Sequence, residues 1–419
     1  MTKVHRLANG VTVLCDPVPG YDTLALSVVA GRGARWESAD RSGWSHLLEH
    51  MVFKGAGERS AKDIVEAIEA DGGHINAATG QERTSFQVRA LAGGLPLAMA
   101  VSADLVQRPA LDADDLGKEI HVVGQEIAEA ADTPDDVVFE LAQGAAFPDQ
   151  PLGRPILGRP ETIATATPPT LEAWRAGLYS ADRLVVSAAG AVAEDELLRL
   201  SETSFGSLAT AGAPPAPGAR FVGGATRERR RLEQAHLVFM LPAPAVSDPD
   251  YWALRLYAEM LGGGMSSRLF QEARERLGLA YAIDAWAEAW SDIGVLGIYA
   301  GCAAANAGRL ARVAGEQITA LAAGCQPAEL ARAKAQLKAS LFMGRESLTA
   351  RAEMAAAQWL AFNRLLSAAE MAAAIDAVAA QDIARLAARL LAEGRFAACA
   401  LGPRAAMDAP DRLGEALFG

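Results

Sequence analysis

The sequence is poor in cysteine and histidine and contains no long apolar run. Only four cysteines occur among its 419 residues, namely Cys15, Cys302, Cys325 and Cys399. They have neither the density of a disulfide scaffold nor the close spacing of cysteines that bind a metal. A disulfide-stabilised small domain and a cysteine-ligated metal site are therefore excluded, and we expect buried thiols.

The chain also lacks the features of a membrane or nucleic-acid-binding protein. No stretch of about 18 apolar residues is present, so a membrane-spanning helix is not predicted. The first residues enter a strand pattern without the charged region, apolar core and cleavage site of a secretion signal. Acidic residues outnumber basic ones by 51 to 39, and the net charge of −12 argues against a nucleic-acid partner and favours basic peptides. We expect a cytoplasmic protein with no membrane partner.

Two of the six histidines lie one helical turn apart in the segment Gly43–Gly55. His46, Glu49 and His50 form an inverted zinc-peptidase motif, HxxEH. On a helix, residues i and i+4 project side by side, so both imidazoles can reach one metal ion while Glu49 stays near it. Zn²⁺ suits such a site because it accepts neutral imidazole and lowers the pKa of a bound water towards about 7. The alternative is an amphipathic helix with incidental histidines.

A catalytic zinc site needs a third protein ligand, and a second helical segment offers one. Glu126 is the leading candidate, and it lies seven residues after Glu119. That spacing places both carboxylates on roughly the same helical face, so that one can bind the metal while the other orients a histidine. His121 and Glu129 are the competing candidates for the third ligand.

These motifs resemble the pitrilysin/insulinase family of zinc peptidases, and the resemblance covers nearly the whole chain. It is strongest to the short two-domain branch that is similar to the mitochondrial processing peptidases. Besides the HxxEH segment, it rests on residues 7–13, 72–84, 151–158 and 262–270 and on Glu119 and Glu126. The resemblance implies that His46, His50 and Glu126 bind one Zn²⁺ per chain. It also implies that Glu49 is the general base that activates the zinc-bound water.

The second half of the chain contains an arginine and a tyrosine at a spacing found in the family. Arg274 is expected on a helix closed by Gly278, and Tyr281 is expected to open the next strand. By residue type alone, a surface arginine and a half-buried tyrosine are the expectation. The resemblance implies instead that both point towards the bound substrate. Tyr281 would donate to the oxyanion of the tetrahedral intermediate, and Arg274 would hold substrate backbone.

A further segment is a candidate for binding the substrate. In the family, the strand edge that matches Asn76 and Ala77 pairs with the substrate backbone, which gives affinity with little demand on sequence. The alternative for Asn76 is a residue in a turn between strands. Ala78 stands where the family often has a bulky aromatic residue.

The chain is predicted to contain two similar domains. Residues 209–224 are rich in proline, glycine and alanine, which predicts a linker. This linker would separate a zinc-binding domain at 1–208 from a second domain at 225–419. Strand patterns alternate with long helical ones, which predicts an α+β fold of mainly antiparallel sheets covered by helices. The resemblance implies two homologous α/β-sandwich domains in a clamshell. The second half has no HxxEH motif, so one metal site is expected.

The sequence therefore predicts a zinc-dependent metalloendopeptidase that hydrolyses peptides or extended polypeptide segments enclosed in a cavity. The alternative is a non-catalytic or partner-dependent subunit of an assembly similar to the processing peptidases. Relatives of this length commonly pair, so we expect a homodimer.

Overall fold

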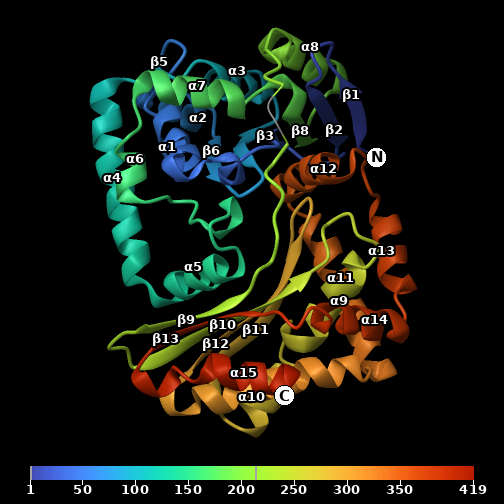
Figure 1. Ribbon diagram of the computed structural model, residues 1–419. Coiled ribbons are helices and arrows are strands. Elements are labelled where there is room, and N and C mark those ends of the chain that lie inside the picture. The colour runs from blue at the N-terminus through green and yellow to red at the C-terminus, as the bar shows by residue number, and fades with distance from the viewer. Residues whose placement is uncertain (1, 213–214) are drawn as a thin grey trace. The chain divides into compact units, whose positions relative to one another are not determined.

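The computed structural model describes residues 2–212 and 215–419 (Figure 1). Contacts within the chain define two compact units, each built from three segments. Unit 1 comprises Met1–Ala128, Pro155–Pro217 and Met343–Leu365, and unit 2 comprises Glu129–Arg154, Gly218–Phe342 and Leu366–Gly419. Each unit thus includes a segment that is distant in the sequence from its main part. The division of the chain into two consecutive domains, 1–208 and 225–419, stays a prediction.

A six-stranded sheet forms the centre of unit 1. Its strand order is β1 (Lys3–Arg6), β2 (Thr12–Pro17), β8 (Leu184–Gly190), β3 (Thr23–Ala30), β7 (Thr84–Leu91) and β6 (His74–Thr79). All neighbours pair antiparallel except β2 and β8. The sheet is covered on both faces, which explains why β3 is apolar along nearly its whole length.

The two faces of this sheet contact different helices. Alternate β3 residues such as Leu26 and Val28 join a large core formed with several helices, whereas Val29 packs under one other helix, α12 (Leu348–Phe362). The helices of the large core are α1 (Trp44–Val52), α2 (Ala61–Ala70), α3 (Leu95–Gln107), α4 (Ala113–Asp132), α6 (Pro160–Ile163), α7 (Pro168–Leu178) and α8 (Glu194–Phe205). A short hairpin, β4 (Gly55–Ala56) and β5 (Arg59–Ser60), follows α1.

Unit 2 is built around a five-stranded sheet. Its strand order is β11 (Ala280–Ala289), β12 (Gly294–Ala303), β10 (Gln234–Ala243), β13 (Ala397–Gly402) and β9 (Gly224–Arg229), and only β13 and β9 pair parallel. On one face, Val238 and Met240 of β10 pack with α5 (Pro134–Ala146). On the other face lie α9 (Tyr251–Gly262), α10 (Ala307–Ala322), α11 (Pro327–Gly344), α13 (Ala368–Ala377), α14 (Ala380–Leu391) and α15 (Ala409–Phe418).

The predicted α+β class is confirmed, because each unit is a mainly antiparallel sheet covered by helices. In the expected linker at 209–224, residues 213 and 214 lie outside the described residues, and the described remainder has no helix or strand before β9. Cys15, Cys302 and Cys399 are buried as expected, whereas Cys325 is half-buried. Among the described residues, no helix is long and apolar enough to cross a membrane.

Candidate metal centre

The short helix α1 presents both histidines of the motif on one side. Its apolar residues, among them Leu47, Leu48 and Met51, are buried in the core of unit 1, which holds the helix against the sheet. His46 and His50 lie one turn apart on the same side, with their ring centroids 4.7 Å from each other. The predicted helical spacing therefore does bring the two imidazoles together.

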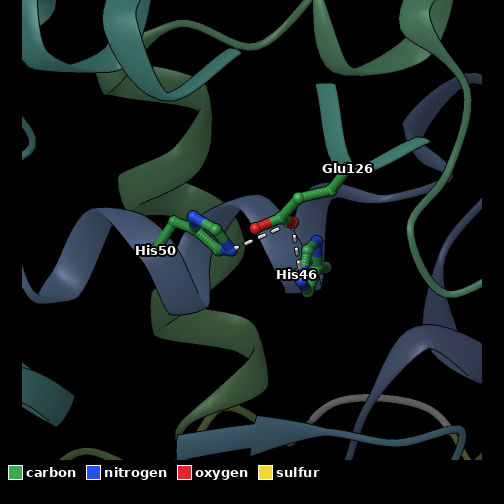
Figure 2. Close-up of side chains that lie close together, drawn as sticks. All are labelled: His46, His50 and Glu126. Carbon is green, nitrogen blue, oxygen red and sulfur yellow. Dashed lines mark ion pairs between the residues drawn. The ribbon is translucent and has the colours of Figure 1, made fainter. Parts of the chain in front are cut away.

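Glu126 extends from α4 towards these two rings (Figure 2). Its Oε2 atom lies 3.5 Å from Nε2 of His50 and 3.8 Å from Nε2 of His46. Possible ligand atoms of all three residues lie within 4.8 Å of one another. In the part of the chain that the structure describes, this is the one group of three or more such residues that could hold a metal ion.

The chemistry of this donor set fits zinc. Burial, and secondarily the neighbouring His50, lower the pKa of His46 to about 4, so its imidazole is neutral near pH 7. The lone pairs of two imidazole nitrogens and one carboxylate oxygen then point towards the same place. A cation between these atoms stabilises such an arrangement. Two histidines and one glutamate form a known ligand set of catalytic zinc sites. These residues therefore fit a zinc ion.

Glu119 orients His50 from the side opposite to Glu126. One of its carboxylate oxygens lies 3.1 Å from Nδ1 of His50, and the other is 2.7 Å from Nζ of Lys54. The Glu119 side chain is only 6% exposed, so it is held firmly between these two partners. A hydrogen bond to Nδ1 leaves Nε2 of His50 as the metal-binding nitrogen. The sequence prediction included Glu119 but not Lys54, which lies four residues after His50.

Glu49 lies beside the two histidines and is largely buried. Burial raises the pKa of Glu49, and the polar groups of the neighbouring Thr79, at the end of β6, oppose this shift. A carboxyl group whose pKa is raised towards neutrality is suited to accept and return a proton. Thr79 was not among the predicted site residues, and nothing in its local sequence indicates that it contacts Glu49.

The predicted substrate-binding residues lie on the edge strand β6. Asn76 pairs with Gln87 and Ala77 pairs with Phe86 of β7, which is the only strand that pairs with β6 in the described chain. Asn76 is therefore a strand residue, and its alternative interpretation as a turn residue is wrong. Its side chain is exposed, whereas Ala77 is buried.

Arg274 and Tyr281 both belong to unit 2. Arg274 lies in a π-helical segment, Phe270–Arg276, with its guanidinium 4.7 Å from the ring centroid of Phe270. Gly278 has a φ of +60° and ends this helical segment, as predicted. Tyr281 is the second residue of β11 and is 63% exposed. Its hydroxyl is therefore accessible, and its role towards a substrate stays a prediction.

The two competing candidates for the third ligand lie apart from the cluster. His121 and Glu129 are both exposed on α4, and His121 lies close to the side-chain amide of Gln125. Neither belongs to the group of possible ligands formed by His46, His50 and Glu126.

Comparison with known proteins agrees with the sequence motifs. Residues 13–160 match the family model described as insulinase (peptidase family M16), and residues 165–337 match the model described as peptidase M16 inactive domain. An uncharacterised zinc protease of Rickettsia felis is 36% identical over 347 residues, which cover 83% of this chain and 84% of the relative. One of Mycobacterium tuberculosis is 34% identical over 404 residues, covering 95% of this chain and 92% of the relative.

Solved structures show the same fold. A protease from Helicobacter pylori superposes with a TM-score of 0.88 at 20% identity, covering 96% of this chain and 99% of that chain. A chain of complex III2 from Candida albicans, with Inz-5 bound, has a TM-score of 0.86 at 20% identity and covers 99% of each chain.

Together, the fold and the sequence matches define a peptidase of two sheet-based units. The chain belongs to the insulinase family, peptidase family M16, which confirms the resemblance seen in its motifs.

Proposed function

We propose that the protein is a zinc-dependent metalloendopeptidase that hydrolyses peptides or extended polypeptide segments. The convergence of His46, His50 and Glu126 is the observation that carries this proposal. Two further facts support it: the relatives at 33–37% identity are named zinc proteases, and Glu49 lies beside the three ligand candidates. One Zn²⁺ per chain is proposed, because the described residues contain a single such group.

The zinc ion would act as a Lewis acid that polarises the scissile carbonyl and makes a water molecule more acidic. The residues of the chain supply the remaining functions. Glu49 takes the proton of the attacking water and then gives it to the leaving amine nitrogen. Its buried carboxyl group holds this proton more readily than an exposed one does. Glu119 keeps the His50 ring in its orientation throughout.

The substrate is proposed to bind as an extended strand beside β6. Backbone groups on the outer edge of this strand, at Asn76 and Ala77, would form main-chain hydrogen bonds with a peptide of almost any sequence. The exposed hydroxyl of Tyr281 would donate to the oxyanion, and Arg274 would hold substrate backbone. These two roles, and enclosure of the peptide in a cavity, are proposed because the chain resembles the family in this region.

A cytoplasmic location is proposed for the protein. A homodimer is also proposed, because relatives of this length commonly pair. The alternative, a non-catalytic or partner-dependent subunit, is not favoured, because a complete set of ligand candidates and a base is present.

The proposal is tested by comparing the wild type with Glu49→Gln after the metal content of both has been measured. Each is incubated with a mixed peptide library, and cleavage is read by mass spectrometry. We expect about one zinc per chain in both proteins and a rate about 10²- to 10⁴-fold lower in the variant, since general-base catalysis contributes about this much. His46→Ala is the matched control that loses both the metal and the activity.

Cleavage by Glu49→Gln at the wild-type rate would show that another group is the base. A wild type that binds zinc and cleaves no peptide would point to a missing partner. A wild type without zinc would contradict the proposed site.

A further inference from the structure

Helix α1, which bears both histidines, begins at a residue that has no side chain to cap it. The N-cap residue is Gly43, with a φ of +92°. A Cβ atom at this position would lie 2.6 Å from the carbonyl oxygen of Leu157 and 2.7 Å from Cα of Gly158. The residues that usually accept hydrogen bonds from the first free amides, namely serine, threonine, aspartate and asparagine, are thus sterically excluded here.

Glu37, six residues before Gly43, takes over this function. Its Oε2 atom accepts a hydrogen bond of 2.8 Å from the amide of Gly43, and Oε1 accepts one of 2.7 Å from the amide of Ser45. Glu37 is only 3% exposed. A buried carboxylate bound to two amides at a helix N-terminus forms charge-assisted hydrogen bonds and complements the helix dipole.

The residue directly after Ser45 is His46, so Glu37 holds the turn from which one ligand candidate projects. A helix of nine residues is marginal by itself, and its unravelling starts at the terminal turn. His50 lies one turn further on and has its own support from Glu119. We infer that Glu37 is a positioning residue of the metal centre, whose carboxylate keeps the His46 imidazole opposite Glu126.

Other contacts hold the same region without binding these amides. The indole of Trp44 donates to the carbonyl of Thr162 at 3.0 Å, and the Thr162 hydroxyl donates to the carbonyl of Ser42 at 2.6 Å. These bonds, together with the buried apolar side of α1, will keep the helix docked when Glu37 is changed. Loss of the carboxylate should therefore loosen the first turn and leave unit 1 folded.

This inference rests on the proposed zinc site, so its test measures zinc binding directly. Glu37→Ala and Glu37→Gln are compared with the wild type by competition against a chromophoric chelator and by the visible spectrum of the Co²⁺-substituted protein. Ser60→Ala is the matched control, since Ser60 caps α2 by accepting a hydrogen bond of 3.2 Å from the Asp63 amide. It removes a helix cap that belongs to a different helix.

For Glu37→Ala we expect a zinc dissociation constant about 10- to 100-fold higher, the usual effect of removing a group that supports a metal ligand. The Co²⁺ spectrum should change, kcat should follow zinc occupancy, and KM should stay close to the wild-type value. Glu37→Gln keeps a neutral oxygen acceptor and should restore part of the affinity. Ser60→Ala should bind zinc as the wild type does.

A folded Glu37→Ala protein with wild-type zinc affinity and an unchanged Co²⁺ spectrum would overturn the inference. Equal losses of zinc affinity in Glu37→Ala and Ser60→Ala would also overturn it, because they would show that any loss of stability in unit 1 weakens zinc binding. If Glu37→Ala does not fold, Glu37→Gln decides: weaker zinc binding supports the inference and unchanged binding refutes it. Failure of the proposed function would be seen separately, as a wild type that binds no zinc.

Discussion

Burial shifts the pKa values of His46 and Glu353, two ionisable residues of unit 1, in opposite directions. Desolvation lowers the pKa of His46 to about 4 and so keeps the imidazole neutral, which is the form that binds zinc. Desolvation raises the pKa of Glu353 on α12, although Ser27, Arg83 and Gln87 oppose the shift. In the described chain, Oε1 of Glu353 is buried and has no hydrogen-bond partner. Its charged form is therefore a cost to stability.

Glu353→Gln is expected to stabilise the protein near pH 7 by about 1 kcal/mol, or about 2–4 °C in Tm. A raised carboxyl pKa means that the folded state binds the proton more tightly than the unfolded state. Stability is accordingly lost as pH rises from the unfolded pKa through the folded one. The gain from glutamine should then be largest at pH 7 and should nearly vanish at pH 4. Thermal unfolding at both pH values measures this, and a larger gain at pH 4 would contradict it.

The start of α1 is an element whose geometry depends on one glycine. Gly43 combines a left-handed backbone with close contact to the segment before α6, and Ile163 of α6 lies 2.9 Å from a Cβ built on this residue. The helix could not begin at this point with any larger residue, because the neighbouring backbone would have to move. The position of His46 thus depends on steric fit as well as on capping.

Gly43→Ala is expected to destabilise the protein by about 2–4 kcal/mol, the sum of backbone strain and overpacking. Gly20→Ala is the matched control, since Gly20 has a φ of +86° and nothing lies within 4 Å of its Cβ position. Gly20→Ala should show the effect of backbone strain alone, a loss of about 1 kcal/mol in the free energy of unfolding. Urea unfolding compares the two, and an equal loss in both variants would show that the contact with Leu157 is unimportant.

At the scale of the whole molecule, His46, His50 and Glu126 belong to unit 1, whereas Arg274 and Tyr281 belong to unit 2. Each unit has its own core, formed in unit 1 around β3 and in unit 2 around β10. Zinc bound at His46, His50 and Glu126 would therefore add stability directly to the core of unit 1 alone.

Removal of zinc with a chelator should abolish peptide cleavage and destabilise unit 1. Zinc at about 1,000 times its dissociation constant contributes about 4 kcal/mol, all of which is lost with the metal. Hydrogen exchange followed by mass spectrometry should show reduced protection in α1 and α4, with recovery when zinc is added back. His46→Ala should be insensitive to the chelator. Unchanged protection throughout unit 1 would refute a zinc site at these residues.

Much of the candidate site was predictable from local sequence. The spacing of His46 and His50 places them together on any helix, and the seven-residue interval between Glu119 and Glu126 places these two on one face of α4. The α+β class with mainly antiparallel sheets was predicted from strand patterns that alternate with long helical ones. The membership of α12 in unit 1 and of α5 in unit 2 had no such local indication.

The sequence by itself determined the ligand types, their helical spacing and the family, because these depend on side-chain chemistry and on helix geometry within a few residues. Only the tertiary structure decided that Glu126 meets the histidines, that Lys54 holds Glu119, that Thr79 contacts Glu49 and that Glu37 caps α1. These contacts join residues on different elements. They depend on how buried surfaces pack, which no local pattern specifies.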